Sequence, residues 1–301
     1  MKHFSISYSK RIFVLSVLSF ILLITSAFIV PSSAVMKEFI SIEKLMIEGK
    51  LDVSISGLGG YQEECVAFNI KNLTGDTVLL RIEPGRRLHS EDTTMQDIFI
   101  VKHKNLTLPP FATLTEKGYG FCCKSHHRSP GQASVFGIGT MAPESWQKLA
   151  NVIDKGNFPV KAIQDAVWCL SNDHPISGIT DKNPANVDLL RRTVAKIKGV
   201  EVPWYTVIFE EAATENQLFS DKHLRLTGGI NYQINSNAII SILVKDRKGQ
   251  VIQSLVKGNS KSSGSYIYDV DLSVSGWPKG EYIIYIYEDY SNLNKKVVFK
   301  L

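Results

Sequence analysis

Two cysteines stand side by side at the end of a predicted strand, and two histidines follow within a few residues. The segment is Gly120-Phe121-Cys122-Cys123, with His126 and His127 after it. A cysteine is a nucleophile once its thiol loses a proton, and an imidazole can accept that proton near neutral pH. These residue types therefore allow nucleophilic chemistry at Cys122, with His126 or His127 assisting proton transfer.

A glutamine on a predicted helix supplies the second part of the constellation, in the segment Ile163-Gln164-Asp165-Ala166-Val167-Trp168. Together with Phe121-Cys122, this segment resembles the thioester domains of bacterial surface adhesins. Those domains have an aromatic-Cys pair on a strand and an apolar-Gln-x-x-apolar motif on a helix. The resemblance implies that the Cys122 sulfur attacks the Gln164 carboxamide, that ammonia leaves, and that an amine on a host surface can capture the internal thioester.

Disulfide formation is the main alternative use of the cysteines. The chain has four of them, and in an oxidising compartment paired cysteines are the usual state, with three pairings open to four residues. If Cys122 enters a thioester, then Cys65, Cys123 and Cys169 remain and cannot all pair. Two disulfides would instead leave a structural protein without this chemistry.

Two further alternatives use the histidines. A Cys/His hydrolase would pair Cys122 with His126 or His127, and Asp173-His174 could supply further partners. The same cysteines and histidines are zinc-ligand types, but adjacent strand residues face opposite sides and no second ligand pair of standard spacing follows. We therefore predict no metal and no cofactor, favour binding over catalysis, and leave enzyme activity open.

The N-terminus predicts export. Lys2, Lys10 and Arg11 precede a run without charge from Ile12 through Met36, and Ser32-Ser33-Ala34 offers small residues to a signal peptidase. Residues 1–34 are thus a signal peptide or, if uncleaved, a membrane anchor. Either outcome places the body outside the cytoplasm, because the basic residues hold the N-terminus inside.

The charge gives no support for a nucleic-acid partner. The chain has 34 Lys and Arg against 29 Asp and Glu, and three of the basic residues precede Val35. The remaining 31 basic residues, against 29 acidic ones, give the mature chain a net charge of +2. Nucleic-acid binding relies on a much larger positive excess.

The elements that must position Cys122 and Gln164 belong to a first domain, residues 35–208. Apolar residues alternate in Leu51-Val53-Ile55 and Val66-Phe68-Ile70, which is typical of half-buried strands. After Pro143 the period becomes helical, and further helices are expected from Pro159 and around Val187 to Ile197. Gly137-Ile138-Gly139 predicts a turn. The expected fold is a β-sandwich-like domain with a three-helix segment.

A linker at Phe209 to Asn216 leads into a second, all-β domain, residues 209–301, whose strand spacing predicts an immunoglobulin-like β-sandwich. The turn Asp246 to Gly249, the strand start Gly280-Glu281-Tyr282 and the ending Lys295-Lys296-Val297-Val298 resemble the sorting and immunoglobulin-like modules of type IX secreted surface proteins. The alternation still running at Leu301 predicts a final strand.

Together these patterns predict a mainly β, two-domain protein that is secreted or held at the cell surface. The favoured function is adhesion or binding to a surface ligand, a protein or a glycan, with a Cys122–Gln164 thioester as its covalent form. Membrane contact is expected only through an uncleaved N-terminal segment. A disulfide-stapled structural protein and an exported Cys/His hydrolase remain the alternatives.

Overall fold

The computed structural model describes residues 38–211 and 218–301, so the predicted export segment and part of the predicted linker lie outside the described residues. The chain is mainly β, with 48% strand, 18% helix and four helices among these residues. Residues Phe39–Leu301 form one compact unit. The described part contains no helix long and apolar enough to span a membrane.

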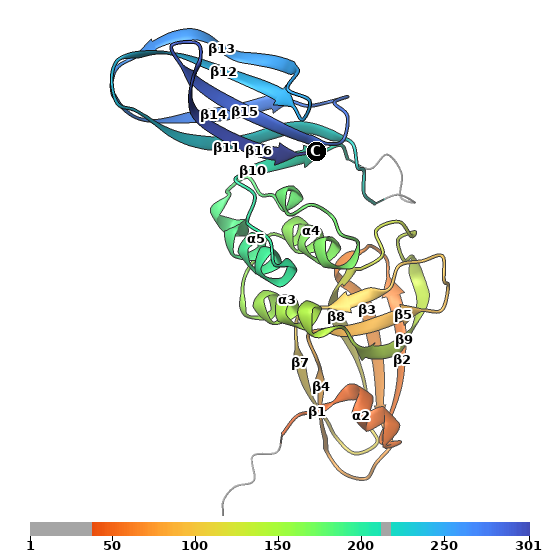
Figure 1. Cartoon of the computed structure of the whole chain (residues 1–301). Coiled ribbons are helices and arrows are strands. Elements are labelled where there is room, and N and C mark those ends of the chain that lie inside the picture. Colours follow the sequence, from red (N-terminus) through yellow and green to blue (C-terminus); the bar gives the residue numbers. More distant parts are fainter. Residues whose placement is uncertain (1–37, 212–217) are drawn as a thin grey trace, which may run out of the picture. The chain divides into compact units, whose positions relative to one another are not determined.

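The first half of this unit is built on a closed barrel of six antiparallel strands (Figure 1). In barrel order the strands are β2 (Leu51–Leu58), β3 (Gln62–Asn72), β8 (Thr113–Cys122), β6 (Ile98–Ile100), β5 (Arg86–Ser90) and β9 (Gln132–Met141). Alternating side chains point inward and form a barrel core that includes Val66, Phe68, Ile98, Cys122 and Phe136. The predicted sandwich-like arrangement is therefore wrong for this domain, although its strands are present.

Glycines explain why the sheet can close. A Cβ at Gly118 would lie 2.5 Å from the Phe68 ring, and one at Gly120 would lie 2.4 Å from Ile98 Cγ2. Both glycines lie in β8, where neighbouring side chains cross the strand inside the barrel. Gly137 and Gly139 belong to β9, so the predicted turn at these residues is wrong. A Cβ at Gly139 would lie 2.6 Å from the His89 ring, which shows the same close approach.

A smaller three-stranded sheet joins the barrel. Its strands are β1 (Ile40–Ser41), β4 (Val78–Ile82) and β7 (Lys104–Leu108), with the short helix α2 (Ile42–Ile47) after β1. Buried Arg86 binds Glu83 and Glu43 and donates to the Gly139 carbonyl at 2.9 Å, so that β5, α2 and β9 are joined at one guanidinium. A buried arginine is tolerated here because carboxylates and a carbonyl take its donors.

Three helices cover one outer side of the barrel, as Figure 1 shows. They are α3 (Glu144–Lys155), α4 (Val160–Ser171) and α5 (Ala185–Lys198), with a 3-10 turn η1 (Ile176–Gly178) between the last two. Pro143 and Pro159 directly precede α3 and α4, which confirms the predicted starts, and the Asn183 side chain accepts from the Ala185 amide at 3.1 Å before α5. The helix–barrel cluster contains Phe99, Val101, Phe121 and Cys123 from the barrel and Leu149, Ile153, Ile163, Val167, Leu190 and Val194 from the helices.

The last third of the chain forms two sheets around one core of buried residues. One contains β10 (Tyr205–Phe209), β11 (His223–Ile234) and β14 (Gly264–Ser273), and the other contains β13 (Val251–Lys261), β12 (Ala238–Asp246), β15 (Glu281–Glu288) and β16 (Asn292–Lys300). The predicted final strand is confirmed, because β16 pairs with β15. Strand β10 already pairs with β11 from Tyr205, a few residues before the predicted boundary.

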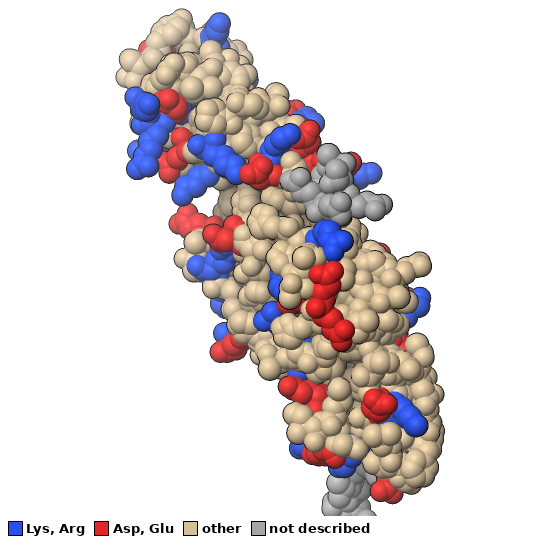
Figure 2. Space-filling view, turned by 90° about the vertical axis from the view of Figure 1, so that its right-hand side faces the viewer, with Lys and Arg blue, Asp and Glu red and all other residues tan. Residues whose placement is uncertain are grey.

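Charges are mixed on the face drawn in Figure 2, where Lys and Arg lie interspersed with Asp and Glu. Many of the basic side chains pair with nearby acids, such as Lys148 with Glu144 and Arg192 with Asp188. The near-neutral mature chain therefore presents no broad positive tract on this face.

Candidate functional site

Helix α4 places Gln164 next to the end of strand β8. The helix starts after Pro159 and buries Ile163 and Val167 in the helix–barrel cluster. Gln164 is only 2% exposed, and its Nε2 donates to the Cys122 carbonyl oxygen at 2.7 Å. The two residues singled out by the sequence motifs, 42 positions apart, are thus in direct contact.

Cys122 is the last residue of β8, and its amide donates to the Tyr61 carbonyl at 2.9 Å. Its side chain is fully buried in the barrel core, and burial raises the pKa of the thiol well above its usual value. The carbonyl that binds Gln164 belongs to the backbone of Cys122, whereas the Cys122 sulfur lies in the barrel core. Cys122 and Gln164 are separate side chains in the structure, and the thiol is free.

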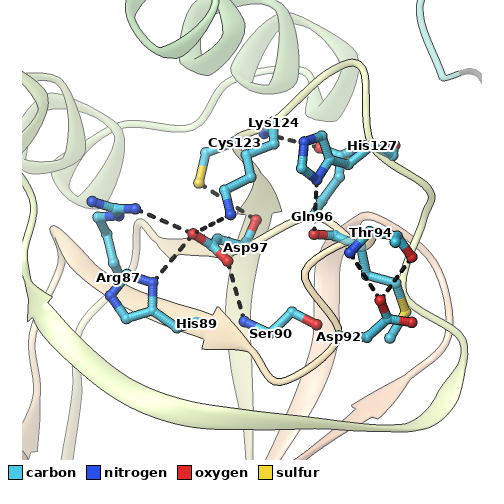
Figure 3. Close-up of polar contacts among 11 residues, drawn as sticks. Arg87, His89, Ser90, Asp92, Thr94, Gln96, Asp97, Cys123, Lys124 and His127 are labelled. Carbon is cyan, nitrogen blue, oxygen red and sulfur yellow. Dashed lines mark hydrogen bonds and ion pairs between the residues drawn. The ribbon is translucent and has the colours of Figure 1, made fainter.

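Cys123 faces the other way, as alternation along a strand requires. It lies in the helix–barrel cluster, and its amide and its Sγ both donate to the Asp97 carbonyl, at 3.0 and 3.4 Å. Figure 3 shows this contact beside the Asp97 carboxylate, which pairs with Arg87, His89 and Lys124. Cys123 is therefore held by its own partners, apart from the Gln164 carboxamide that binds the Cys122 carbonyl.

The expectation of disulfides is wrong in this structure. All four cysteines are free and buried. Cys65 and Cys122 belong to the barrel core, whereas Cys123 and Cys169 belong to the helix–barrel cluster. The number of cysteines and the expected oxidising compartment both favoured disulfides. A buried thiol can also pack as a small apolar group, and these four do so.

The two histidines after Cys123 do not contact a cysteine through any hydrogen bond in the described structure. His127 lies in the loop after β8, where its Nδ1 contacts the Met95 carbonyl at 3.3 Å and its own carbonyl accepts from Gln96 (Figure 3). The His126 ring lies 6.4 Å from the His174 ring. With the Cys122 thiol protonated and no imidazole bonded to it, the described geometry offers no Cys/His nucleophile pair.

The described residues give no support for a metal site either. Within residues 38–211 and 218–301 no group of three or more His, Cys, Asp and Glu side chains is arranged to hold a metal ion. The doubled cysteines point to opposite faces of the sheet, and Cys123 is committed to the Asp97 carbonyl.

A third histidine, His174, lies close to Trp168 of helix α4. It is 8% exposed, its Nε2 lies 3.0 Å from the Ser125 Oγ, and its ring centre lies 5.6 Å from that of Trp168. Burial, followed by the nearby His126, lowers the pKa of His174 to about 4. The imidazole is therefore neutral at physiological pH and is a weak base there.

A cavity of about 550 Å³ opens beside Gln164, and we refer to it as the Gln164 cavity. Its lining includes Tyr61, Gln164, Asp165, Trp168, His174 and Phe209. Burial raises the pKa of Asp165 to about 6 even though Lys161 pairs with it at 2.7 Å. Two buried polar atoms on this lining, Gln164 Oε1 and Trp168 Nε1, have no hydrogen-bond partner in the described part of the chain. Buried polar atoms normally have a hydrogen-bond partner, so these two atoms make the cavity a candidate functional site.

No family model, curated protein or solved structure matches this chain. The site therefore has to be interpreted from its own geometry.

The motifs located Cys122, Gln164 and Trp168, and His174 was considered only as a partner in a hydrolase, but the sequence did not indicate Tyr61. Tyr61 follows Gly59-Gly60 in a turn, and His174 follows a helix end, so neither has a periodic signal. The only indication in the sequence was that aromatic residues and histidines recur near the two motifs. The Tyr61 and Trp168 rings, whose centres are 6.3 Å apart and whose planes are nearly parallel, come from segments far apart in the chain.

Proposed function

We propose that the chain is an exported binding protein whose site forms an internal thioester between Cys122 and Gln164 and uses it to capture a nucleophile covalently. One observation carries the proposal. The buried Gln164 carboxamide lies against Cys122, with Nε2 bonded to the Cys122 carbonyl at 2.7 Å and Oε1 without a partner in the described structure. This contact supports the proposal because it holds the Gln164 carboxamide next to the residue that carries the sulfur.

The reaction is balanced without any further reagent. The Cys122 sulfur forms a bond to Cδ of Gln164, the Cδ–Nε2 bond breaks, and the thiol proton leaves with the nitrogen as ammonia. An incoming amine later forms a bond to Cδ, the C–S bond breaks, and the amine proton returns to the sulfur. His174 lines the same cavity as a neutral imidazole and is our candidate for hydrogen bonding to the departing ammonia or the incoming amine, in place of His126 or His127.

Burial is compatible with this chemistry. A Cys122 thiolate is disfavoured in the barrel core, as the raised pKa of the thiol shows, but a thioester has no charge and suffers no such penalty. Gln164 is almost completely shielded from solvent, which would protect the linkage from hydrolysis. The Gln164 cavity then provides the route by which a slender amine reaches the carbonyl carbon.

Export and surface location complete the proposal. They rest on the N-terminal pattern of charge and apolar residues and on the ending of the chain, with an immunoglobulin-like module as the interpretation of the two C-terminal sheets. A covalent bond is useful outside the cell because it withstands forces that separate non-covalent contacts. The ligand class remains a protein or a glycan presenting an amine.

Methylamine labelling followed by peptide mapping tests the chemistry. We expect methylamine on the peptide containing Gln164 and a newly free thiol at Cys122. Cys122→Ser should abolish the label, whereas the neighbouring Cys123→Ser should retain it, because Cys123 faces Asp97. Labelling that persists in Cys122→Ser, or that moves to another glutamine, would refute the Cys122–Gln164 linkage.

A further inference from the structure

The two unpartnered polar atoms of the Gln164 cavity form a donor and an acceptor on one face of α4. Gln164 Oε1 can accept a hydrogen bond and Trp168 Nε1 can donate one, and neither has a partner in the described structure. The residues are four positions apart in the same helix, which places their Cβ atoms about 5–6 Å from each other. Both line the same cavity.

The indole is fixed in position by its surroundings. Trp168 is 3% exposed, and its ring stacks nearly parallel to Tyr61, with an angle of 9° between the planes. The His174 ring contacts it from another side, at 5.6 Å between centres. Ring contacts, and not a hydrogen bond, hold this N–H group in position. It can therefore donate to a new acceptor without first breaking a hydrogen bond.

We infer that the Trp168 indole N–H stabilises the oxyanion that develops on Gln164 Oε1 when the thioester forms and when an amine opens it. This inference rests on the proposed function and adds a catalytic residue to it. Attack on Cδ, by the Cys122 sulfur or by the amine, moves the carbonyl electron pair onto Oε1 and makes the carbon tetrahedral. The electron pair returns when ammonia or the thiol leaves. A donor with no ground-state partner is used only while that charge exists, and this is the condition for lowering a barrier.

A contact made only in the transition state would give both unpartnered atoms a role. A buried donor and a buried acceptor left unpaired each destabilise the fold. Native proteins retain such groups mainly where function requires them. Placing one of each on adjacent turns of a helix, beside a reactive carbonyl and inside a cavity, matches the requirements of an oxyanion site.

Trp168→Phe tests the inference, since it keeps an aromatic ring against Tyr61 and removes the N–H donor together with part of the indole. We expect the variant still to reach the thioester form on prolonged maturation, but to react with methylamine more slowly by about 10²–10³-fold. Trp146→Phe is the matched control, because Trp146 packs edge-on to Phe99 in the helix–barrel cluster and does not line the Gln164 cavity. Its methylamine rate should equal that of the parent chain.

The outcomes separate the two proposals. A parent chain that loses no ammonia and takes up no methylamine defeats the thioester itself. A thioester in both proteins, with the same methylamine rate in Trp168→Phe as in the parent, overturns the role of Trp168 alone. Should Trp168→Phe fail to fold, 4-fluorotryptophan in all four tryptophan positions keeps the fold and makes the N–H more acidic. The methylamine rate should then rise, and an unchanged rate would overturn the inference.

Discussion

The Asp165 carboxyl lies next to Gln164 in the sequence and on the lining of the same cavity. Burial raises its pKa to about 6, even with Lys161 beside it. A group whose pKa is higher in the folded chain than in the unfolded chain stabilises the fold at low pH, and that contribution is lost as the pH rises from about 4 through about 6. At neutral pH the ionised Asp165 therefore destabilises the fold.

Asp165→Asn should raise the free energy of unfolding at pH 8 by about 1–3 kcal/mol and have a much smaller effect at pH 4, because the amide stays neutral at both values. Urea unfolding of the two proteins at each pH measures the difference. Asp188→Asn is the matched control, since Asp188 forms an exposed i,i+4 pair with Arg192 on α5. A stabilisation of equal size at pH 4 and pH 8 would argue against ionisation as its cause.

The glycines of the barrel strands determine how closely β8 approaches its neighbours. Gly120 lies two residues before Cys122, and a Cβ there would meet Ile98 Cγ2 at 2.4 Å, whereas a Cβ at Gly137 in β9 meets nothing within 4 Å. We expect Gly120→Ala to destabilise the fold by about 1–3 kcal/mol through overpacking, and Gly137→Ala to have little effect. Thermal unfolding of both variants checks this, and equal melting temperatures would mean that β8 is not the tight strand.

At the same scale, alternation predicted most strands that have regular apolar patterns, and proline predicted where α3 and α4 begin. Strand β9 was missed because Gly137 and Gly139 interrupt its alternation, although glycine is needed there for close approach to His89. Barrel closure was missed because it depends on contacts between β2 and β9, which are far apart in the chain. Period identifies a strand and its faces, but it does not identify the strand's neighbours.

The candidate site shows the same division. The motifs placed Cys122 on a strand end and Gln164 on a helix, and the structure brings the two into contact. The side of the strand on which each cysteine lies followed from alternation, whereas the roles of Tyr61, Trp168 and His174 at one cavity required the folded chain. His126 and His127 were plausible from proximity in sequence, but the loop after β8 directs His127 toward Met95 and Gln96.

For the molecule as a whole, a barrel with a helical layer holds Cys122 and Gln164, the pair that we propose to react, and two further sheets form the remainder of the compact unit. The free thiols fit this assignment, because a chain with all four cysteines in disulfides would have no sulfur left for Gln164. Residues 35–301 carry 31 basic against 29 acidic side chains, and this near balance gives no support for general electrostatic attraction of a partner.

The most direct test is the intact mass of the mature protein, purified without reductant from a host that exports it. We predict a mass lower by one ammonia than the mature sequence requires, and the full sequence mass for Cys122→Ser prepared in the same way. A parent chain with the full sequence mass, or one lighter only by the hydrogens of disulfide bonds, would contradict the internal thioester.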